Sequence, residues 1–298
     1  MNPPPLRRPL SRRSLLAGFL AAGVPLAHAD APLSIGRFTS PRRSYATNSY
    51  WLEGRDGLIL IDTQFLPSEA LQFLELAERS TGKKARTAVV LHPNPDKFNG
   101  TAALQSRGVR VITSHQVAEL IEPIHRIRMS WYYDDFKPDY PKEQPRPEVF
   151  GDDTRPLRES GLDLTLHVLG AGASAAHVVA QAGDAIFVGD LVTSRGHAWL
   201  EFALFDDWLR RLDDLEAMRP KRVYVGRGEP GGPELIDATR DYLRQVRRIV
   251  LAAKPSGELG WFRRWRLKSE IVAAYPNYDW DGFVWESLPA IWRQLQNR

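Results

Sequence analysis

The sequence predicts an α+β fold, a four-layer αβ/βα sandwich in which two sheets carry helices on their outer sides. Three observations predict it. Strands and helices alternate through the first half of the chain, a long aromatic segment interrupts them, and strands followed by helices then return. The chain has 298 residues, of which 43% are hydrophobic and nine are tryptophan, so it is long and apolar enough for a sizeable packed core.

Turn residues and hydrophobic periodicity indicate the elements of the first half. Residues 30–48 are polar and predict irregular backbone. Two strands, 48–53 and 57–62, flank a glycine-rich turn. An amphipathic helix spans 68–80, because its apolar residues recur on one face and Thr81-Gly82 ends it. The elements expected next are a strand at 85–91, a helix at 98–106, a strand at 109–113 and a helix at 117–127.

Residues 129–160 depart from this alternation. They contain five prolines and a cluster of aromatic residues, which is too aromatic for a disordered linker. We expect either a lid over a pocket or a long surface excursion. The second half then predicts strands at 162–169, 177–182 and 185–188, a helix at 207–217, a strand at 222–225 and a long helix at 233–252.

The N-terminal residues resemble an export signal. Four arginines precede a short apolar stretch, Leu15 to Ala27, which ends in the A-x-A site Ala27-His28-Ala29. Ser11-Arg-Arg-Ser-Leu-Leu16 is similar to a twin-arginine signal. We therefore predict an export signal at 1–29 and a periplasmic or secreted protein. An ordinary secretory signal and an uncleaved anchor are the alternatives. No other stretch is long and apolar enough to span a membrane, so no span is expected after cleavage.

Charge and cysteine content exclude several classes of protein. The whole chain has 40 basic and 36 acidic residues, but residues 1–29 hold four arginines and no acid. The remainder is formally neutral, so nucleic acid is not an expected partner. The chain has no cysteine, which excludes disulfides, cysteine zinc sites and thiol catalysis.

Five short segments, each at or near the end of a predicted strand, carry the polar residues of the candidate site. They are Gly57-Leu-Ile-Leu-Ile-Asp-Thr63, His92-Pro-Asn-Pro-Asp-Lys-Phe-Asn-Gly100, Gly170-Ala-Gly-Ala-Ser174 followed by His177, Phe187-Val-Gly-Asp190 and Val225-Gly-Arg-Gly228. In this order and spacing they resemble the motifs of the metallo-β-lactamase superfamily. The family versions are a strand ending in Asp-Thr, H-x-H-x-D-H, G-x-G-H-[ST], the bridging aspartate and P-G-H-G. The resemblance covers roughly residues 35–250 and implies one domain at 30–260.

The chemistry that the resemblance implies is zinc-assisted hydrolysis, in which two zinc ions activate a water and polarise the scissile group. When the family's ligand positions are carried over one by one, this sequence keeps His92, Asp96 and Asp190. Four other positions are changed, and the residues that stand where the family has ligands are Asn94, Lys97, Ala173 and Arg227. A dizinc site is therefore not expected.

The residues that remain allow at most one metal. His92, His177 and Asp190 are the candidate ligands of a single zinc, so the expected cofactor is none or one zinc. His177 has packing beside a strand as its alternative role. If the protein is active, Asp96 is the candidate catalytic residue.

The substitutions suggest that a metal site has become a salt-bridge cluster. Lys97 and Arg227 are cations placed where a metal dication is held in the family, and they could neutralise two otherwise buried carboxylates. The residues predicted to form this cluster or to line the pocket beside it are Asn94, Asp96, Lys97, Asp190, Arg227 and His197.

The last segment, 261–298, holds five of the nine tryptophans and several basic residues. Aromatic residues interleaved with basic ones could bind nucleic acid or a membrane surface. Because the rest of the chain is neutral, we predict instead two amphipathic helices that pack on the sandwich as a C-terminal extension.

Three functions agree with these observations. The first is a pseudoenzyme or small-molecule binding protein that keeps the pocket of a zinc hydrolase without its metals. The second is an active hydrolase of an ester-like or lactone-like substrate that uses a single metal. The third is an accessory protein that acts through its aromatic surface. Fold alone does not decide among them.

Overall fold

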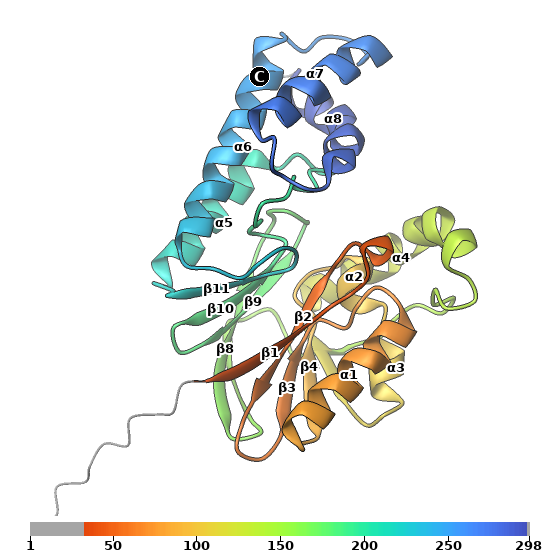
Figure 1. The fold of residues 1–298 in the computed structure, drawn as a ribbon, viewed down its shortest axis with the longest axis vertical. Helices are drawn as coiled ribbons and strands as arrows, with labels where there is room; N and C mark the ends of the chain where they lie inside the picture. Colours follow the sequence, from red (N-terminus) through yellow and green to blue (C-terminus); the bar gives the residue numbers. More distant parts are fainter. Residues whose placement is uncertain (1–32, 297–298) are drawn as a thin grey trace, which may run out of the picture. The chain divides into compact units, whose positions relative to one another are not determined.

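The computed structural model describes residues 33–296. The predicted export signal at 1–29 lies outside the described residues, as do the last two positions of the C-terminal segment. The first sheet has the order β1-β2-β3-β4-β5-β6, with β1, β2 and β3 antiparallel and β3 to β6 parallel (Figure 1). Its strands are Ser34–Thr39, Asn48–Glu53, Leu58–Ile61, Ala85–Val89, Arg110–Thr113 and Glu148–Val149.

The second sheet has the order β11-β10-β9-β8-β7. Neighbouring strands are antiparallel except for β10 and β11, which run parallel. The strands, from β7 to β11, are Arg155–Glu159, Leu162–Leu169, His177–Ala182, Ala185–Gly189 and Arg222–Val225.

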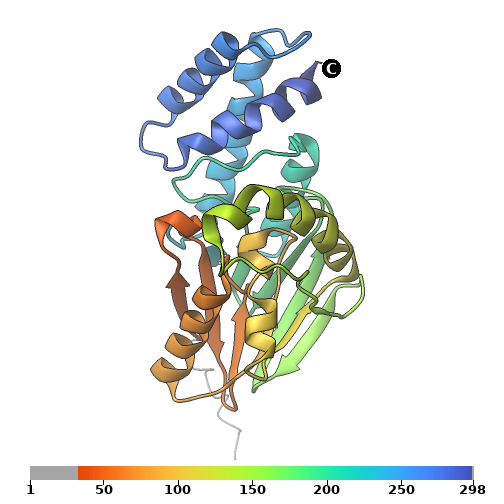
Figure 2. The same cartoon turned by 90° about the vertical axis from the view of Figure 1, so that its right-hand side faces the viewer.

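Helices cover the outer side of each sheet. On the first sheet these are α1 to α4, and on the second α5 and α6 (Figures 1 and 2). The two sheets face each other between these helical layers, so the predicted αβ/βα sandwich is confirmed. The helices α1 to α6 are Pro67–Thr81, Pro95–Phe98, Thr101–Gln105, His115–Phe136, Phe205–Ala217 and Glu234–Ala252.

Aromatic and branched side chains hold the two sheets together. Tyr50 of β2 packs on Phe187 of β10 and Tyr224 of β11, with ring centroids 5.5 and 5.2 Å apart. The buried Tyr50 hydroxyl donates a hydrogen bond of 2.7 Å to the carbonyl of Val225. A polar group buried at this depth needs such a partner, so the bond fixes how the two sheets lie against each other. Apolar side chains of both sheets share one buried cluster around this contact.

Two parts of the first sheet and its helices differ from the sequence expectation. Residues 34–39, expected to be irregular, form β1, which pairs antiparallel with β2 along its whole length. Helix α4 continues to Phe136 through an internal proline, Pro123, so the first part of segment 129–160 is helical. The rest of that segment supplies the short strand β6 and the strand β7.

The C-terminal segment forms two helices, α7 (Trp261–Ala274) and α8 (Asp281–Leu295). They pack on each other and on α6 through one buried face each, with Leu267 and Trp292 among the buried residues. In Figures 1 and 2 they lie beyond the strand ends at which the candidate motifs are found. Within residues 33–296, no helix is long and apolar enough to cross a membrane.

Candidate functional site

The site is built from loops that leave the strands at one edge of the sandwich. Asp62 follows β3, His92 and Asp96 follow β4, Asp190 follows β10 and Arg227 follows β11. Since these strand ends meet at the same edge, residues far apart in sequence are brought within hydrogen-bonding distance. The backbone amide of Leu91 donates to Asp62 Oδ1 at 2.9 Å, which ties the loop after β4 to the end of β3.

Five charged residues at this edge form what we call the ion-pair cluster: Asp62, Asp96, Lys97, Asp190 and Arg227. The Lys97 side chain is fully buried, with its Nζ 3.1 Å from Asp96 Oδ2, 3.2 Å from Asp190 Oδ1 and 4.0 Å from Asp62 Oδ2. Arg227 bridges the same two carboxylates: Nη1 donates to Asp190 Oδ2 at 2.6 Å and Nη2 to Asp96 Oδ2 at 2.5 Å. Two side-chain cations are thus shared between two buried carboxylates.

The backbone around the ion-pair cluster is shaped to admit these groups. A Cβ atom at Gly226 would lie 2.3 Å from Asp190 Oδ1 and 2.7 Å from Lys97 Nζ, so no residue with a side chain fits there without displacing the ion pair. The hydroxyl of Thr47 donates a further bond of 3.0 Å to Asp96 Oδ2. A charged group removed from water needs such additional partners, so the surroundings stabilise Asp96 as an anion.

The electrostatics of the ion-pair cluster favour ionised partners. Burial alone would raise the pKa of Asp190, but Arg227 and Lys97 outweigh it and hold that pKa well below its ordinary value. The pKa of Asp96 is lowered for the same reasons. Burial opposes the charge on Lys97, yet the nearby carboxylates raise its pKa. Asp62 differs: burial raises its pKa to about 7, despite the neighbouring Lys97.

Two histidines lie beside the ion-pair cluster. His92 Nε2 is 3.5 Å from Asp190 Oδ2, and the rings of His92 and His177 are 5.0 Å apart. The backbone amide of Ser174 donates to His177 Nε2 at 2.8 Å, so that nitrogen is an acceptor and the proton of the neutral ring lies on Nδ1. Burial, followed by nearby His92, holds the pKa of His177 well below its usual value.

These residues do not fit the pair of zinc ions that the motif positions hold in zinc hydrolases. Lys97 and Arg227 already engage Asp96 Oδ2 and both carboxylate oxygens of Asp190, so a zinc bound through these atoms at about 2.0–2.2 Å would have to displace the cations. Two cations next to a dication are strongly repulsive. Within residues 33–296, no three His, Asp or Glu side chains are arranged so that they could hold a metal ion.

Two of the four positions that lack the family's histidine, Asn94 and Ala173, lie in a small neighbouring hollow. His92, Asn94, Ala173 and Asp190 line it together with Trp199 and other residues. His177 is not among the lining residues, although its ring lies next to that of His92. The three candidate ligands of a single metal, His92, His177 and Asp190, therefore lie close together. The unprotonated nitrogen of His177, Nε2, however, accepts the hydrogen bond from the backbone amide of Ser174.

Comparison with known proteins agrees with the fold and the motif order. The metallo-beta-lactamase superfamily matches residues 42–227, which is more than half of the chain. The chain belongs to this superfamily. It is therefore a hydrolase-like protein of the metallo-β-lactamase fold, with ion pairs where most of the family's metal ligands are expected. No curated protein matches the sequence.

Solved structures of the superfamily share the fold at low sequence identity. A metallo-beta-lactamase from Pontibacter korlensis is 20% identical, with a TM-score of 0.55 over 71% of this chain and 94% of that one. One from Hirschia baltica is 20% identical, with a TM-score of 0.52 over 71% and 92%. FIM-1 from Pseudomonas aeruginosa, in its mono-zinc form, is 17% identical, with a TM-score of 0.54 over 72% and 96%. At these identities the likeness concerns the fold alone.

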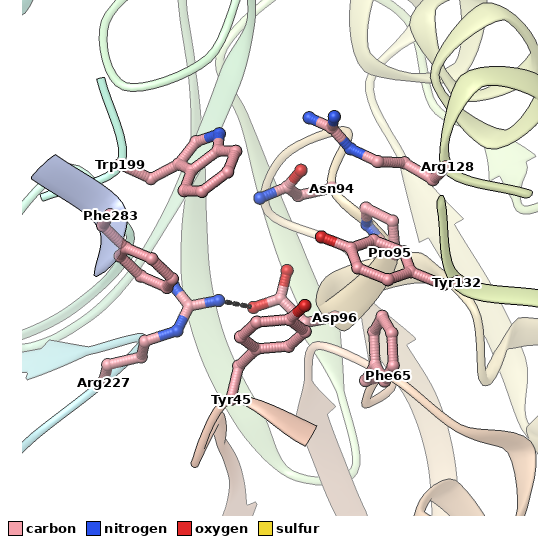
Figure 3. Close-up of a pocket in the computed structure, with 10 residues that line it drawn as sticks. All are labelled: Tyr45, Phe65, Asn94, Pro95, Asp96, Arg128, Tyr132, Trp199, Arg227 and Phe283. Carbon is pink, nitrogen blue, oxygen red and sulfur yellow. Dashed lines mark hydrogen bonds and ion pairs between the residues drawn. The ribbon is translucent and has the colours of Figure 1, made fainter. Parts of the chain in front are cut away.

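Two cavities adjoin the ion-pair cluster, and we call them together the cleft. The smaller, of about 30 Å³, is lined by Asp96 and Asn94 and by aromatic side chains that Figure 3 shows around it. The larger, of about 220 Å³, is lined by Asp190 and by the loop that follows it. Trp199, Arg227 and Phe283 line both, so the two cavities meet at Arg227.

His197 lines the larger cavity but takes no part in the ion-pair cluster. Its Nδ1 lies 3.1 Å from the hydroxyl of Tyr242, and its ring packs against Tyr275 and Tyr278. Burial lowers the pKa of His197 to about 4, so the ring is neutral at pH 7. It thus supports the wall of the cleft.

Several cleft residues could not be found from the motifs. Trp199 and Phe283 lie outside every family motif, and Phe283 belongs to the C-terminal extension. Arg128, on α4, is buried and pairs with Glu201 through a short contact. The concentration of aromatic side chains in 129–160 and 261–298 was a sequence signal for Tyr132 and Phe283, but none pointed to Trp199 or Arg128. The remaining aromatic residues of the smaller cavity are Tyr45, Phe65 and Tyr132.

Proposed function

We propose that this protein is a metal-free, ligand-binding member of the superfamily, a pseudoenzyme in which an ion-pair cluster replaces the zinc pair. One observation carries the proposal. The ammonium of Lys97 lies 3.1 and 3.2 Å from the carboxylates of Asp96 and Asp190, in the position where the family's motifs place a metal. Lys97 and Arg227 together engage Asp96 Oδ2 and both oxygens of Asp190, which leaves a zinc ion few free donor atoms, while the cleft beside them stays open.

The cleft is suited to a small planar molecule. Its volume is below the about 300–1,000 Å³ of sites for drug-sized ligands. The ring of Phe283 stacks on Trp280 with centroids 5.4 Å apart and meets Trp199 edge-on at 5.0 Å. Flat aromatic walls of this kind favour ligands with a planar ring, since stacking and edge contacts both need one.

Polar groups of the cleft would orient the ligand. Arg227 lies at the junction of the two cavities, and its guanidinium carbon is 5.7 Å from the ring centroid of Phe283. Thr193, Ser194 and Arg195 add hydroxyl and guanidinium donors to the wall of the larger cavity. Hydrogen-bond donors beside these aromatic side chains suit a planar ligand whose ring carries an acceptor such as a carboxylate or carboxamide.

Ligand preference tests this proposal. Benzoate and benzamide are expected to stabilise the protein against heat and to bind in calorimetry, and their saturated analogues, cyclohexanecarboxylate and its amide, to bind more weakly. Trp199→Ala and Phe283→Ala should each weaken the planar ligands about tenfold, which corresponds to about 1.4 kcal/mol. Phe262→Ala, at an exposed aromatic residue of α7 outside the cleft, is the matched control and should bind like the wild type.

Two outcomes contradict the planar-ligand proposal. The first is that planar and saturated probes bind equally or not at all. The second is that Trp199→Ala and Phe283→Ala both retain wild-type affinity. Chelator-sensitive turnover of esters or lactones by the wild type would favour instead the single-metal hydrolase built on His92, His177 and Asp190.

We also propose that the protein acts outside the cytoplasm, as a periplasmic or secreted protein. The support is in the sequence: the arginine pair, the short apolar stretch and the A-x-A site of residues 1–29.

A further inference from the structure

We propose that the N-terminal part of helix α7 binds the surface of a phospholipid bilayer with anionic headgroups. The observation is an exposed aromatic patch on this helix, which we define as Trp261, Phe262 and Trp265. Their exposed fractions are 68%, 69% and 49%. The predicted C-terminal helices form and pack on α6, but α7 does so through Leu267 and Ile271, which leaves these three aromatic side chains exposed to solvent.

Helical geometry explains why these side chains face solvent. At about 100° per residue, the three aromatic residues occupy an arc of about 100° on α7. The buried residues Leu267 and Ile271 lie on the opposite side of the helix. Phe262 and Trp265 stack with ring centroids 6.0 Å apart, which makes the patch continuous.

Basic residues flank the aromatic patch. Arg266 is exposed and borders the aromatic arc on one side of the helix; Arg263, further round on the same side, is exposed too, with its guanidinium carbon 5.2 Å from the ring centroid of Trp292. Lys268 borders it on the other side, where it pairs with Asp281 at 2.7 Å. Guanidinium groups bind phosphate with two parallel hydrogen bonds, so the two exposed arginines are suited to lipid headgroups.

The composition and size of this surface favour a bilayer over a protein partner. Exposed tryptophan and phenylalanine residues flanked by basic residues are typical of helices that lie in the membrane interface, where the aromatic rings sit at headgroup depth. The patch presents on the order of 400 Å² of aromatic surface, given the size of such side chains. A stable protein interface buries about 800 Å² on each partner, roughly twice what this helix face presents.

Vesicle co-sedimentation tests the proposal. The chain from Asp30 onward is suitable, since the described residues 33–296 belong to one compact unit. It is expected to sediment with vesicles of phosphatidylglycerol and phosphatidylcholine, less with pure phosphatidylcholine, and less as salt rises. The variant Trp261→Ser/Phe262→Ser/Trp265→Ser should lower the partition coefficient at least about tenfold, a loss of about 1.4 kcal/mol. Arg263→Gln/Arg266→Gln should weaken binding only to the anionic vesicles.

Matched controls distinguish binding through the aromatic patch from non-specific binding through any exposed apolar side chain. Ile127→Ser and Val149→Ser remove exposed apolar side chains elsewhere and should bind vesicles like the wild type. The proposal is overturned if the wild type does not bind anionic vesicles or if the triple variant binds them equally well. It is also overturned if the patch instead mediates self-association, shown by a wild-type dimer that the triple variant makes monomeric. None of these results bears on the ligand cleft.

Discussion

Replacing Lys97 with alanine is expected to lower the free energy of unfolding by about 3–5 kcal/mol, the usual cost of removing one partner from a buried ion pair. The side chain of Lys97 is fully buried and its ammonium is shared by Asp96 and Asp190. Without it, Arg227 alone would balance two buried carboxylates, and one negative charge would remain uncompensated. Chemical denaturation at neutral pH measures the effect.

Two companion variants show whether the loss comes from the ion pairs. Lys84→Ala removes an exposed lysine paired with Glu78, and such surface pairs contribute only about 0–1 kcal/mol. Lys97→Ala/Asp190→Asn removes the cation together with one of its carboxylates, so we expect it to cost less than the sum of the two single changes. A Lys97→Ala protein that unfolds like the wild type would count against the stabilising role of the ion-pair cluster.

Restoring zinc binding is expected to need several substitutions at once. In the variant Asn94→His/Lys97→His/Ala173→His/Arg227→His, each change adds an imidazole and two remove a repelling cation. His92, Asp96 and Asp190 would complete the ligand set, so we expect uptake of about two zinc ions per chain, as in two-metal hydrolases. Asn94→His alone adds one ligand, while Lys97 and Arg227 still engage the carboxylates. We therefore expect this single variant to bind little zinc.

Elemental analysis and turnover of generic ester and lactone substrates distinguish these variants. Asn94→His is the control for the effect of a single new imidazole. If Asn94→His already binds zinc tightly, the cations do not exclude metal and this account of the site is wrong. A quadruple variant that folds but takes up no zinc would show that the loops no longer hold the ligand positions in a metal-binding arrangement.

Much of the fold could be predicted because the strong local signals agree with the final packing. The turn between β2 and β3 and the periodicity of α1 were enough to place these elements, and the family motifs fixed their order. The strand β1 could not be predicted, since its residues are only partly buried and its conformation depends on pairing with β2. The helix predicted at 117–127 continues to Phe136 in α4, because the aromatic residues after position 128 were interpreted as a separate lid or surface segment.

The charged part of the site was accessible from sequence, and the aromatic part was not. The motifs gave Asp96, Lys97, Asp190 and Arg227 neighbouring positions, and the structure places their charged atoms within 3.2 Å of partners in the set. No motif connects Trp199 with Phe283, which meet through the packing of α8 near the site. On α7, periodicity could not decide which face meets the protein, because one face carries the aromatic residues and the other the aliphatic Leu267 and Ile271.

Zinc content of the mature wild-type protein, purified without chelators, tests the central claim most directly. We predict well under one zinc per chain, because Lys97 and Arg227 engage Asp96 Oδ2 and both carboxylate oxygens of Asp190 and would repel a metal dication. Elemental analysis of the purified protein, before and after incubation with zinc and removal of the unbound ion, gives the answer. Two tightly held zinc ions per chain would contradict the conversion of the metal site into an ion-pair cluster.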